Sequence, residues 1–381
     1  MNILQVTNLF RSAKLFIGGQ FFYLKEHGAN MHLVCSDDKG LEKFALEQKI
    51  KSYKAVEIKR QISILSDIVA LVKICLFIKR NDINVIVGHQ AKGRLLTVLA
   101  GKIMRIPKII IFAHGAIYET ATGFKRWILI LESKFESLCS TKVVCVSNYV
   151  ANLRLGEGID YKRKQIILGK GTCGGIDTQG KFNPDLIRKT ERATLMRSLQ
   201  INNNEFVIGF CGRIVRDKGI IELIDAFDLL KKKYPKADIK VLIVGDFEAR
   251  DSLPIRYIHR ILSDSNIIFT GWITYHIELY YSLMSVYVLP SYREGFGMSL
   301  IEASSMQIPV IANRNTGCNE ALIDCHTGYH VDVTQESICE NLEKLLNEQL
   351  RIEMGKNGRR WVAENFDHSV IWPEVVKLLQ D

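Results

Sequence analysis

The sequence of 381 residues lacks a Cys-x-x-Cys pair, although it contains nine cysteines. The cysteines are odd in number and are scattered from Cys35 to Cys339. Zinc clusters need paired spacing, and secreted scaffolds held by disulfides usually have an even count. The cysteines therefore argue against both kinds of protein, and they predict reduced thiols in the cytoplasm.

The sequence also lacks an apolar run long enough to cross a membrane. Its most apolar window, residues 62–80, is interrupted by Asp67 and Lys73, whereas a span needs ~20 clean apolar residues. We expect a buried or membrane-facing helix there. The start of the chain, MNILQVTNLF, lacks the charged residues and the apolar stretch of a signal peptide and is typical of a first β-strand.

The polar bias of a disordered chain is missing as well, since 47% of the residues are hydrophobic and 24% are charged. The length allows two domains of about 150 residues each. The formal net charge of +10 predicts an anionic partner, such as nucleic acid, phospholipid headgroups or a phosphorylated small substrate. No helix-turn-helix, zinc or RNP-like motif supports the first of these, so we expect no nucleic-acid partner.

What the sequence does contain is an alternation of strand and helix patterns. Short β-branched runs such as NVIVGHQ and FVIGFCGR recur in both halves, and each is continuous, as in strands buried on both faces of a parallel sheet. Helical patterns lie between them, the clearest at residues 217–235. The alternation predicts an α/β protein with two tandem Rossmann-like, doubly wound parallel-sheet domains that face each other across a cleft.

We expect the first domain at residues 1–180, the second at 181–360 and a C-terminal helix at 361–381. The most polar and least strand-like stretch, residues 178–205, is the expected linker. Ligands of open α/β sheets bind outside the carboxyl ends of the strands. The strand endings FCGR, VGD and LPSYREGFG in the second half should therefore converge on one pocket.

The segment FCGRIVRDKGI places two cations after one of these strands. Gly212 and Arg213 follow the strand directly, and Lys218 comes just before a helix. Arginine offers forked donors, lysine a point charge and the helix N-terminus backbone donors, a combination that binds phosphate. The alternative is a pair of solvated loop cations.

Two glutamates, Glu294 and Glu302, flank the point where a later strand becomes a helix, in PSYREGFGMSLIEAS. Gly295 and Gly297 let the backbone between them run close to a ligand. A carboxylate at 302, in an otherwise apolar helix, costs free energy without a partner, and the two hydroxyls of a ribose suit it. A glutamate favoured by the helix dipole is the alternative for Glu302, but it leaves Glu294 unexplained.

A series of segments in this order resembles the retaining nucleotide-sugar glycosyltransferases of family GT4, which have the GT-B fold: GRIVRDKG, VGDFE, LPSYREGFGMSLIEAS, TGCNEAL and TGYHV. The two glutamates match that family's E-x7-E motif. The first half is similar more loosely, in FIGGQFF, HQAKGR, FAHG and GKGTCGGID. The C-terminal segment resembles the helix that crosses back onto the first domain in GT-B proteins. The most similar members act in capsule and O-antigen lipopolysaccharide biosynthesis.

The resemblance implies a role for each matching residue. Arg213 and Lys218 would hold the nucleotide diphosphate, and Glu302 would hold the ribose hydroxyls. Glu294 would contact hydroxyls of the donor sugar, and His114 would lie near the sugar on the opposite wall of the cleft. The implied catalytic residues are thus Glu294, Arg213, Lys218 and His114. The remaining implied substrate-binding positions are Gly18, Gly19, Gly212, Gly295, Phe296 and Gly297.

Some positions carry less information. For His114 the alternative is a loop histidine without a chemical role, although its place at a strand end favours function. Gly317 and Glu320 match a recurring segment of the family, and no chemical role is assigned to Glu320. Phe21–Phe22 and Met298–Ser299 depart from the family pattern beside the sugar pocket, which leaves the donor sugar open.

The resemblance favours front-face substitution with retention, in which the departing diphosphate accepts the acceptor's proton. A glycosyl-enzyme formed on a carboxylate is the alternative. Because the sequence has no Asp-x-Asp triplet, we expect no metal and no other cofactor, with Arg213 and Lys218 stabilising the leaving group. Uracil, guanine and adenine are all open as the base, and the resemblance favours a UDP-sugar.

Basic clusters recur in the first half, some of them beside aromatic residues. They suit an anionic membrane face, at about 1 kcal/mol per basic residue, and ordinary solvated surface is an equal alternative. If a membrane is the partner, the protein lies at the cytoplasmic face of a bacterial inner membrane and its acceptor is a polyprenyl-diphosphate-linked saccharide. The clusters are Lys59–Arg60, Lys79–Arg80, Lys125–Arg126 next to Phe124 and Trp127, and Lys162–Lys164.

We therefore expect a hexosyltransferase that moves a hexose or N-acetylhexosamine from a UDP-sugar to such a saccharide in O-antigen or capsule biosynthesis. A soluble GT4 enzyme with a small-molecule acceptor and an inactive nucleotide-sugar-binding protein are the alternatives. A dinucleotide-dependent dehydrogenase is disfavoured, because the first glycine loop, FIGGQFF, lacks the G-x-G-x-x-G spacing.

Overall fold

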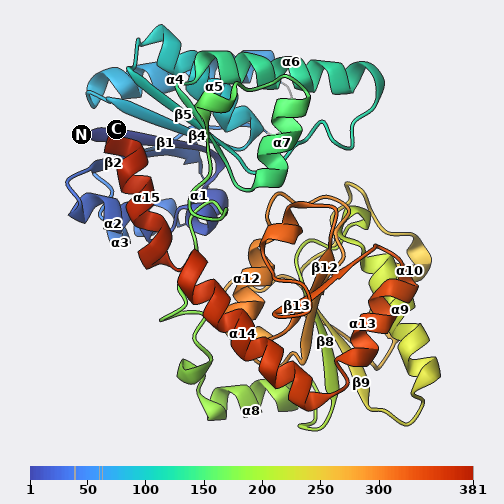
Figure 1. Ribbon diagram of the computed structural model, residues 1–381. Coiled ribbons are helices and arrows are strands. Elements are labelled where there is room, and N and C mark those ends of the chain that lie inside the picture. Colours follow the sequence, from blue (N-terminus) through green and yellow to red (C-terminus); the bar gives the residue numbers. More distant parts are fainter. Residues whose placement is uncertain (38–39, 60, 62, 381) are drawn as a thin grey trace. The chain divides into compact units, whose positions relative to one another are not determined.

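The computed structural model describes residues 1–37, 40–59, 61 and 63–380. The chain divides into two compact units, one of Met1–Gly175 with Ser369–Asp381 and one of Ile176–His368. Each unit contains its own parallel sheet with helices packed against it (Figure 1). The predicted α/β class with two Rossmann-like units is confirmed.

The first unit is built on a seven-stranded sheet in the order β3-β2-β1-β4-β5-β6-β7. The order reverses at β1, so the chain winds first to one edge and then to the other, as Rossmann-like folds do. The strands are β1 (Asn2–Leu9), β2 (Asn30–Ser36), β3 (Ser52–Ala55), β4 (Val85–His89), β5 (Lys108–Ala113), β6 (Lys142–Cys145) and β7 (Gln165–Ile166). The helices are α1 (Phe10–Phe16), α2 (Gln20–Glu26), α3 (Leu41–Glu47), α4 (Ile64–Arg80), α5 (Ala91–Ile103), α6 (Gly123–Cys139), α7 (Asn148–Gly156) and α15 (His368–Gln380), with a short 3-10 turn η1 (Lys162–Lys164).

The second unit repeats this plan with six strands in the order β10-β9-β8-β11-β12-β13. Most residues of its strands are apolar and buried, which explains why the strands appear in the sequence as continuous apolar runs. They are β8 (Phe206–Cys211), β9 (Ile239–Val244), β10 (Ile267–Phe269), β11 (Val286–Leu289), β12 (Val310–Asn313) and β13 (Gly328–Val331). The helices are η2 (Pro184–Leu186), α8 (Lys189–Ser198), η3 (Arg216–Lys218), α9 (Ile220–Lys233), α10 (Ile255–Ser263), α11 (Ile277–Tyr281), α12 (Met298–Ser305), η4 (Gly317–Glu320), α13 (Gln335–Lys344) and α14 (Glu348–Phe366).

The expected linker, residues 178–205, lies inside the second unit and holds η2 and α8. Arg192 of α8 donates to the carbonyl of Ser282 at 3.1 Å, which ties this polar helix to the rest of the unit. A surface helix with a mostly polar composition gives a weak apolar pattern, so the segment resembled a linker in sequence. The division of the chain comes earlier, after Gly175.

The expected helix over residues 361–381 is two helices, because the chain is extended at Asp367, with φ −61° and ψ 150°. The Asp367 carboxylate accepts hydrogen bonds from the backbone N–H of Thr178, at 3.1 Å, and from its hydroxyl. The first helix, α14, belongs to the second unit, and the residues from Ser369 onward belong to the first. There, the indole N–H of Trp372 donates to the carbonyl of Gly174 at 2.8 Å.

Among the described residues, no helix is both long and apolar enough to cross a membrane.

Candidate functional site

Arg213 follows Gly212 at the carboxyl end of β8, in a loop that continues through η3 to α9. Its guanidinium lies 3.0 Å from a carboxylate oxygen of Glu248, and its side chain is 45% exposed. Gly212 itself is held to the neighbouring strand by its N–H, which donates to the carbonyl of Val244 at 2.9 Å. The arginine predicted to bind diphosphate is therefore accessible, and it is oriented by a carboxylate.

Lys218, the last residue of η3, contacts Glu294 directly. Its ammonium donates to a carboxylate oxygen of Glu294 and lies 3.5 Å from the hydroxyl of Ser291. The two side chains are only 13% and 23% exposed, so the pair is screened less than a surface ion pair. The structure thus brings together two residues that the sequence predicted as catalytic.

The loop that carries Glu294 is fixed to η3 at several points. The carbonyl of Asp217 accepts from the N–H of Tyr292 at 2.8 Å and from the hydroxyl of Ser291 at 3.0 Å. The carboxylate of Asp217 accepts from the guanidinium of Arg293 at 2.9 Å. These bonds hold the loop after β11 against the turn before α9, so the positions of Lys218 and Glu294 are set together.

A second segment supports the same loop from η4. The N–H of Gly317 donates to the carbonyl of Glu294 at 3.0 Å. A Cβ atom at position 317 would lie 2.0 Å from the carbonyl oxygen of Gly295, so only glycine fits there. This close approach gives a structural reason for the glycine in the TGCNE segment.

Between the two predicted glutamates, Phe296 does not line an open site. Its ring is 3% exposed and packs edge-on against Phe366, with centroids 5.3 Å apart. The side chain is therefore part of the core, and only its backbone remains available to a substrate. Gly297, the residue before α12, has φ +86°, a left-handed conformation that favours glycine.

Glu302 lies in α12 and is half-buried. One of its carboxylate oxygens accepts a hydrogen bond from the hydroxyl of Tyr281 at 2.8 Å. Burial raises the pKa of Glu302, and this hydrogen bond and the charge of Lys181 act in the opposite direction. The second carboxylate oxygen is not engaged by Tyr281, which leaves an acceptor for ligand hydroxyls.

In the first unit, Gly18 and Gly19 form the turn between α1 and α2. Gly18 has φ +50°, and its N–H donates to the carbonyl of Ala13 at 3.0 Å. A Cβ atom on Gly19 would lie 3.2 Å from the ring of Trp372. The turn comes directly after Phe16, the last residue of α1, whose ring stacks on His114 just after the carboxyl end of β5, so it lies near that edge of the sheet.

His114 lies at the carboxyl end of β5 and is held on several sides. The ring of Phe16 stacks on it with centroids 4.7 Å apart. Its Nε2 lies 3.1 Å from Nδ1 of His89, and Nε2 of His89 lies 2.9 Å from the amide oxygen of Gln5. A chain of hydrogen bonds therefore runs from His114 into the buried end of the sheet.

This chain selects a tautomer. With the Gln5 oxygen accepting from Nε2–H of His89, a neutral His89 has a bare Nδ1, which accepts from Nε2–H of His114. Burial, and then the charge of Arg94, lower the pKa of His114 to about 3. His114 is therefore neutral at pH 7, and its Nδ1 is left as a hydrogen-bond acceptor.

The predicted residues thus form two groups, each at the carboxyl edge of one parallel sheet. Sequence reasoning missed the partners that orient them: Glu248, Tyr281, His89 and Gln5. His89 is the last residue of β4, in the run NVIVGHQ, and a polar residue at a strand end was a usable signal. The hydrogen bond between Tyr281 and Glu302 gave no such signal in the sequence, because the two residues lie in different helices, 21 residues apart.

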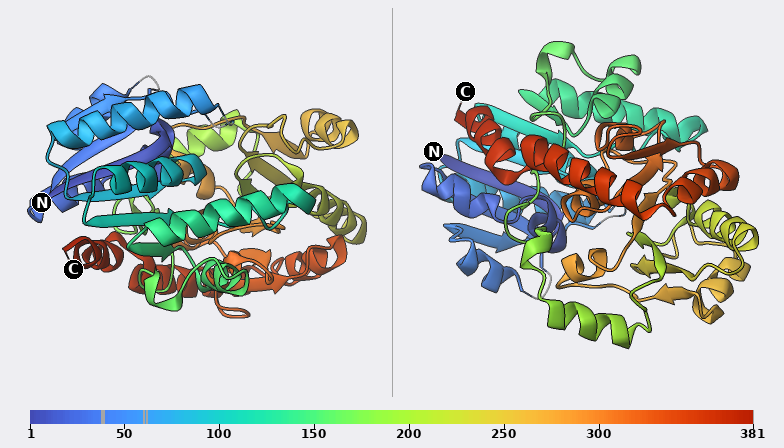
Figure 2. Two further views of the ribbon diagram at one scale, coloured as in Figure 1. Left: turned by 90° about the horizontal axis from the view of Figure 1, so that it is seen from above. Right: turned by 60° about the horizontal axis from the view of Figure 1, so that its bottom comes forward.

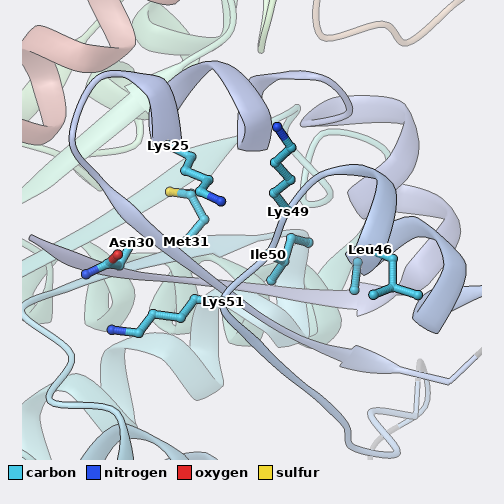
Figure 3. A pocket seen from close by; sticks show the side chains of 8 residues that line it. Lys25, Asn30, Met31, Leu46, Lys49, Ile50 and Lys51 are labelled. Atoms are coloured by element: carbon cyan, nitrogen blue, oxygen red, sulfur yellow. The ribbon is translucent and has the colours of Figure 1, made fainter.

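The pocket in Figure 3 does not belong to either group. It is lined by residues at the starts of β2 and β3, including Asn30 and Lys51, which is the opposite edge of the first sheet. The lysines around it, Lys25, Lys49 and Lys51, are exposed. Within the described part of the chain, no three His, Cys, Asp or Glu side chains are grouped so as to hold a metal ion.

Comparison with known proteins identifies the family. A model described as glycosyl transferase 4-like matches residues 9–147, and one described as glycosyl transferases group 1 matches residues 191–361. The capsular polysaccharide biosynthesis glycosyltransferase CapM of Staphylococcus aureus is 31% identical over 359 residues, which are 94% of this chain and 91% of CapM. The chain belongs to glycosyltransferase family GT4.

A second relative of this GT4 glycosyltransferase is the UDP-Gal:alpha-D-GlcNAc-diphosphoundecaprenol alpha-1,3-galactosyltransferase of Escherichia coli. It is 21% identical over 355 residues, covering 91% of this chain and 88% of that protein. Among solved structures, Anabaena HepE in complex with UDP and glucose has a TM-score of 0.82 at 15% identity, covering 100% of this chain and 99% of HepE. This likeness shows that the fold is GT-B.

Proposed function

We propose that this GT4 glycosyltransferase is a retaining hexosyltransferase that uses a UDP-sugar as donor and a polyprenyl-diphosphate-linked saccharide as acceptor, in O-antigen or capsule biosynthesis. The names of two relatives support this reading, one a capsular polysaccharide glycosyltransferase and the other a transferase to a diphosphoundecaprenol-linked sugar. The structural neighbour solved with UDP and glucose supports a uridine donor.

The observation that carries the proposal is the contact between Lys218 and Glu294. A donor with a diphosphate next to a sugar needs a cation for the diphosphate beside a hydrogen-bond acceptor for the sugar hydroxyls. Lys218 supplies the ammonium for the diphosphate, and Glu294 supplies the carboxylate for the sugar hydroxyls. Because the loops that carry them are bonded together at Asp217, the two groups are preorganised.

The neighbouring residues complete the donor half of the site. Arg213 exchanges Glu248 for the diphosphate, since a guanidinium binds phosphate with the same forked geometry as it binds carboxylate. The free carboxylate oxygen of Glu302 accepts from the ribose hydroxyls. Gly212, Gly295 and the backbone of Phe296 and Gly297 allow or support close approach of the donor.

The first unit contributes Gly18, Gly19 and His114. The glycine turn allows its backbone to approach the diphosphate. His114, neutral and with a bare Nδ1, accepts a hydrogen bond from a hydroxyl of the donor sugar. Its role is positioning and not proton transfer, because a group with a pKa of about 3 is a poor base at neutral pH.

The proposed reaction is front-face substitution. The bond between the anomeric carbon and the UDP oxygen breaks, the acceptor hydroxyl attacks from the same face, and its proton passes to the departing diphosphate. Arg213 and Lys218 stabilise the charge that develops on UDP, so the proposal includes neither a metal ion nor another cofactor.

The acceptor places the enzyme at the cytoplasmic face of the inner membrane. One alternative is a small-molecule acceptor, and it leaves every donor-side assignment unchanged. The other is an inactive protein that binds the nucleotide sugar and does not transfer it. Measured transfer separates these three readings.

A thermal-shift titration with UDP, GDP, ADP and several UDP-sugars, each with and without EDTA, tests the donor side. Ligand at a hundredfold excess over Kd stabilises the folded state by about 2.7 kcal/mol. We expect UDP and one UDP-sugar to raise the melting temperature, and EDTA to leave the shift unchanged. A shift in melting temperature that EDTA abolishes would contradict the proposal that donor binding needs no metal. No shift with any nucleotide would contradict the assignment of a nucleotide-sugar donor.

A further inference from the structure

Helix α6 presents a row of large apolar side chains to solvent. They recur at spacings of three and four residues, so they lie along one face of the helix. Their exposed fractions run from 42% to 73%. The row consists of Phe124, Trp127, Ile128, Leu131, Phe135 and Leu138.

Helix α4 has the same property. Its inner face is buried through Ala70, Ile74, Phe77 and Ile78, yet its outer face is apolar too, with exposed fractions from 47% to 82%. A helix that is apolar all round is normally buried, so the outer face lacks the polar side chains that water would favour. The outer row consists of Ile64, Leu65, Ile68, Val69, Val72 and Leu76.

The two rows belong to one layer. Helix α5 packs against both α4 and α6, and the three helices lie side by side over the same face of the first sheet (Figures 1 and 2). The outer side of α5 adds Ile103, which is also exposed. The two rows and Ile103 are here called the α4–α6 surface, and they hold more exposed apolar side chains than the single scattered ones that a soluble surface normally shows.

The charges exposed on this layer are of one sign. Both α4 and α6 lie wholly within the described residues, and the exposed charged residues on them are Lys73, Lys79, Arg80 and Lys125.

The acids of these helices are turned away or paired. Asp67 lies 2.9 Å from Lys92, and Glu136 is buried 2.8 Å from Arg94. Glu132 is half-buried, and burial raises the pKa of its carboxyl. The α4–α6 surface therefore combines apolar side chains with cations.

We infer that the α4–α6 surface docks on a membrane that contains anionic lipids, with both helices in the plane of the interface. Apolar side chains enter the acyl boundary, and the lysines and Arg80 contact headgroups, as amphipathic interfacial helices do. The inference deepens the proposed function and rests on it only for the identity of the acceptor.

The surface is placed usefully for a lipid-linked acceptor. Helix α6 begins in the loop after β5, which also carries His114, and α4 follows the parallel strand β3. Helices that follow parallel strands begin at the carboxyl edge of the sheet. The α4–α6 surface therefore reaches the edge where the candidate site lies, so a tail can stay in the bilayer while its saccharide reaches that edge.

A second copy of this chain is a poorer occupant. Two such surfaces brought together would place cations near cations, with no exposed carboxylate on α4 or α6 to pair with them. An anionic headgroup layer supplies the missing negative charge.

Sedimentation with phosphatidylcholine vesicles, with and without phosphatidylglycerol, tests the inference. The variant L65S/I68S/W127S/F135S removes two apolar side chains from each helix, and I255S/L262S removes two exposed apolar side chains from α10 in the second unit as a matched control. We expect the first variant to lose roughly tenfold or more in vesicle binding and the control to bind within about twofold of wild type. A charge variant, K73E/K79E/K125E, should lose binding to the anionic vesicles while its fold and melting temperature are kept.

Other outcomes overturn the inference. These are wild-type protein that sediments with neither vesicle, a first variant that binds like wild type, or light scattering that shows a wild-type dimer which the first variant dissociates. UDP binding, measured on the same proteins by titration calorimetry, separates this inference from the proposed function. Vesicle binding without UDP binding contradicts the proposed donor, and UDP binding without vesicle binding contradicts the α4–α6 surface.

Discussion

At the scale of single residues, the ion pair of Lys218 and Glu294 links the two roles assigned to the donor half of the site. Removing the carboxylate charge of Glu294 should weaken the contacts with the donor sugar more than it weakens the binding of the nucleotide. We predict that Glu294→Gln lowers the transfer rate by about 10²–10³, a loss typical of a preorganised charged contact. UDP affinity should stay the same or rise, because Lys218 loses its competitor for the diphosphate.

Paired measurements of kcat by UDP release and of Kd by calorimetry check this prediction. Glu340→Gln, at an exposed position of α13, is the matched control. A loss of UDP affinity as large as the loss of rate would show that Glu294 holds the nucleotide and not the sugar.

Glu302 gives a prediction about pH. Because burial raises its pKa, the folded state binds this proton more tightly than the unfolded chain does. Stability is therefore lost as pH rises through the unfolded value of about 4.3 and toward the raised folded value. We predict that Glu302→Gln unfolds at higher urea concentration than wild type at pH 7, and that this advantage disappears below pH 4.

The same substitution should weaken UDP binding, by about 1.5–3 kcal/mol if the charged acceptor of the ribose hydroxyls is lost. The loss should shrink when 2′-deoxy-UDP replaces UDP, because that ligand has already lost one hydroxyl. Equal losses for the two ligands would mean that Glu302 acts through Tyr281 and not through the ribose.

His114 gives a prediction about the pH dependence of the rate. Since its pKa is lowered to about 3, its protonation does not change between pH 5 and 8. The rate profile of wild type and that of His114→Gln should have the same shape over this range, at different heights. An inflection near pH 6.5 that only the wild type shows would contradict the neutral, hydrogen-bonding role and favour a histidine that titrates.

At the scale of elements, the short helix η4 matters because it supports the loop of Glu294. In Gly317→Ala, the new Cβ would press on the carbonyl of Gly295 at 2.0 Å. We predict a loss of about 1–3 kcal/mol of stability, typical of overpacking, together with reduced transfer. Gly156→Ala in α7 is the control, because nothing lies within 4 Å of its Cβ position.

Urea denaturation of both variants checks this prediction, and we expect Gly156→Ala to change stability by less than about 1 kcal/mol. Equal stabilities of the two variants would mean that the η4 segment moves freely and does not fix the position of Glu294.

The elements themselves were largely predictable from sequence, for a physical reason. Strands such as β5 and β8 are buried on both faces and so appear as continuous apolar runs. What the runs do not reveal is which face of a helix stays exposed. The sequence of the window that becomes α4 allowed either a buried or a membrane-facing helix. Only the packing of α4 in the fold shows that Ile74 is buried and Leu65 is exposed.

The predicted site was recoverable in part for a similar reason. Arg213, Lys218 and Glu294 lie in the segments that connect β8 to α9 and β11 to α12, beyond the carboxyl ends of strands, where ligands bind in such sheets. Phe296 stands in the same loop, yet its ring fills the core against Phe366. Partners such as Glu248 and Tyr281 were missed because a hydrogen bond between distant segments leaves no local pattern. The basic pair Lys59–Arg60 lies only partly within the described residues, since Arg60 is outside them.

At the scale of the whole molecule, each unit contributes one parallel sheet and one group of candidate residues at its carboxyl edge. Unit boundaries in the chain fall after Gly175 and after His368, so the last helix returns the chain to the first unit. This division assigns the donor-side cations and carboxylates to the second unit. The glycine turn, His114 and the α4–α6 surface belong to the first.

The most direct test of the central claim is the transfer reaction itself. The purified enzyme would be incubated with EDTA, UDP-sugars and a short-chain polyprenyl-diphosphate N-acetylglucosamine as acceptor. The mass of the acceptor would then be measured by mass spectrometry. The account predicts that the acceptor gains the mass of one sugar residue as UDP is released, and that Glu294→Gln greatly slows both. An acceptor of unchanged mass with every UDP-sugar, or equal transfer by wild type and Glu294→Gln, would contradict it.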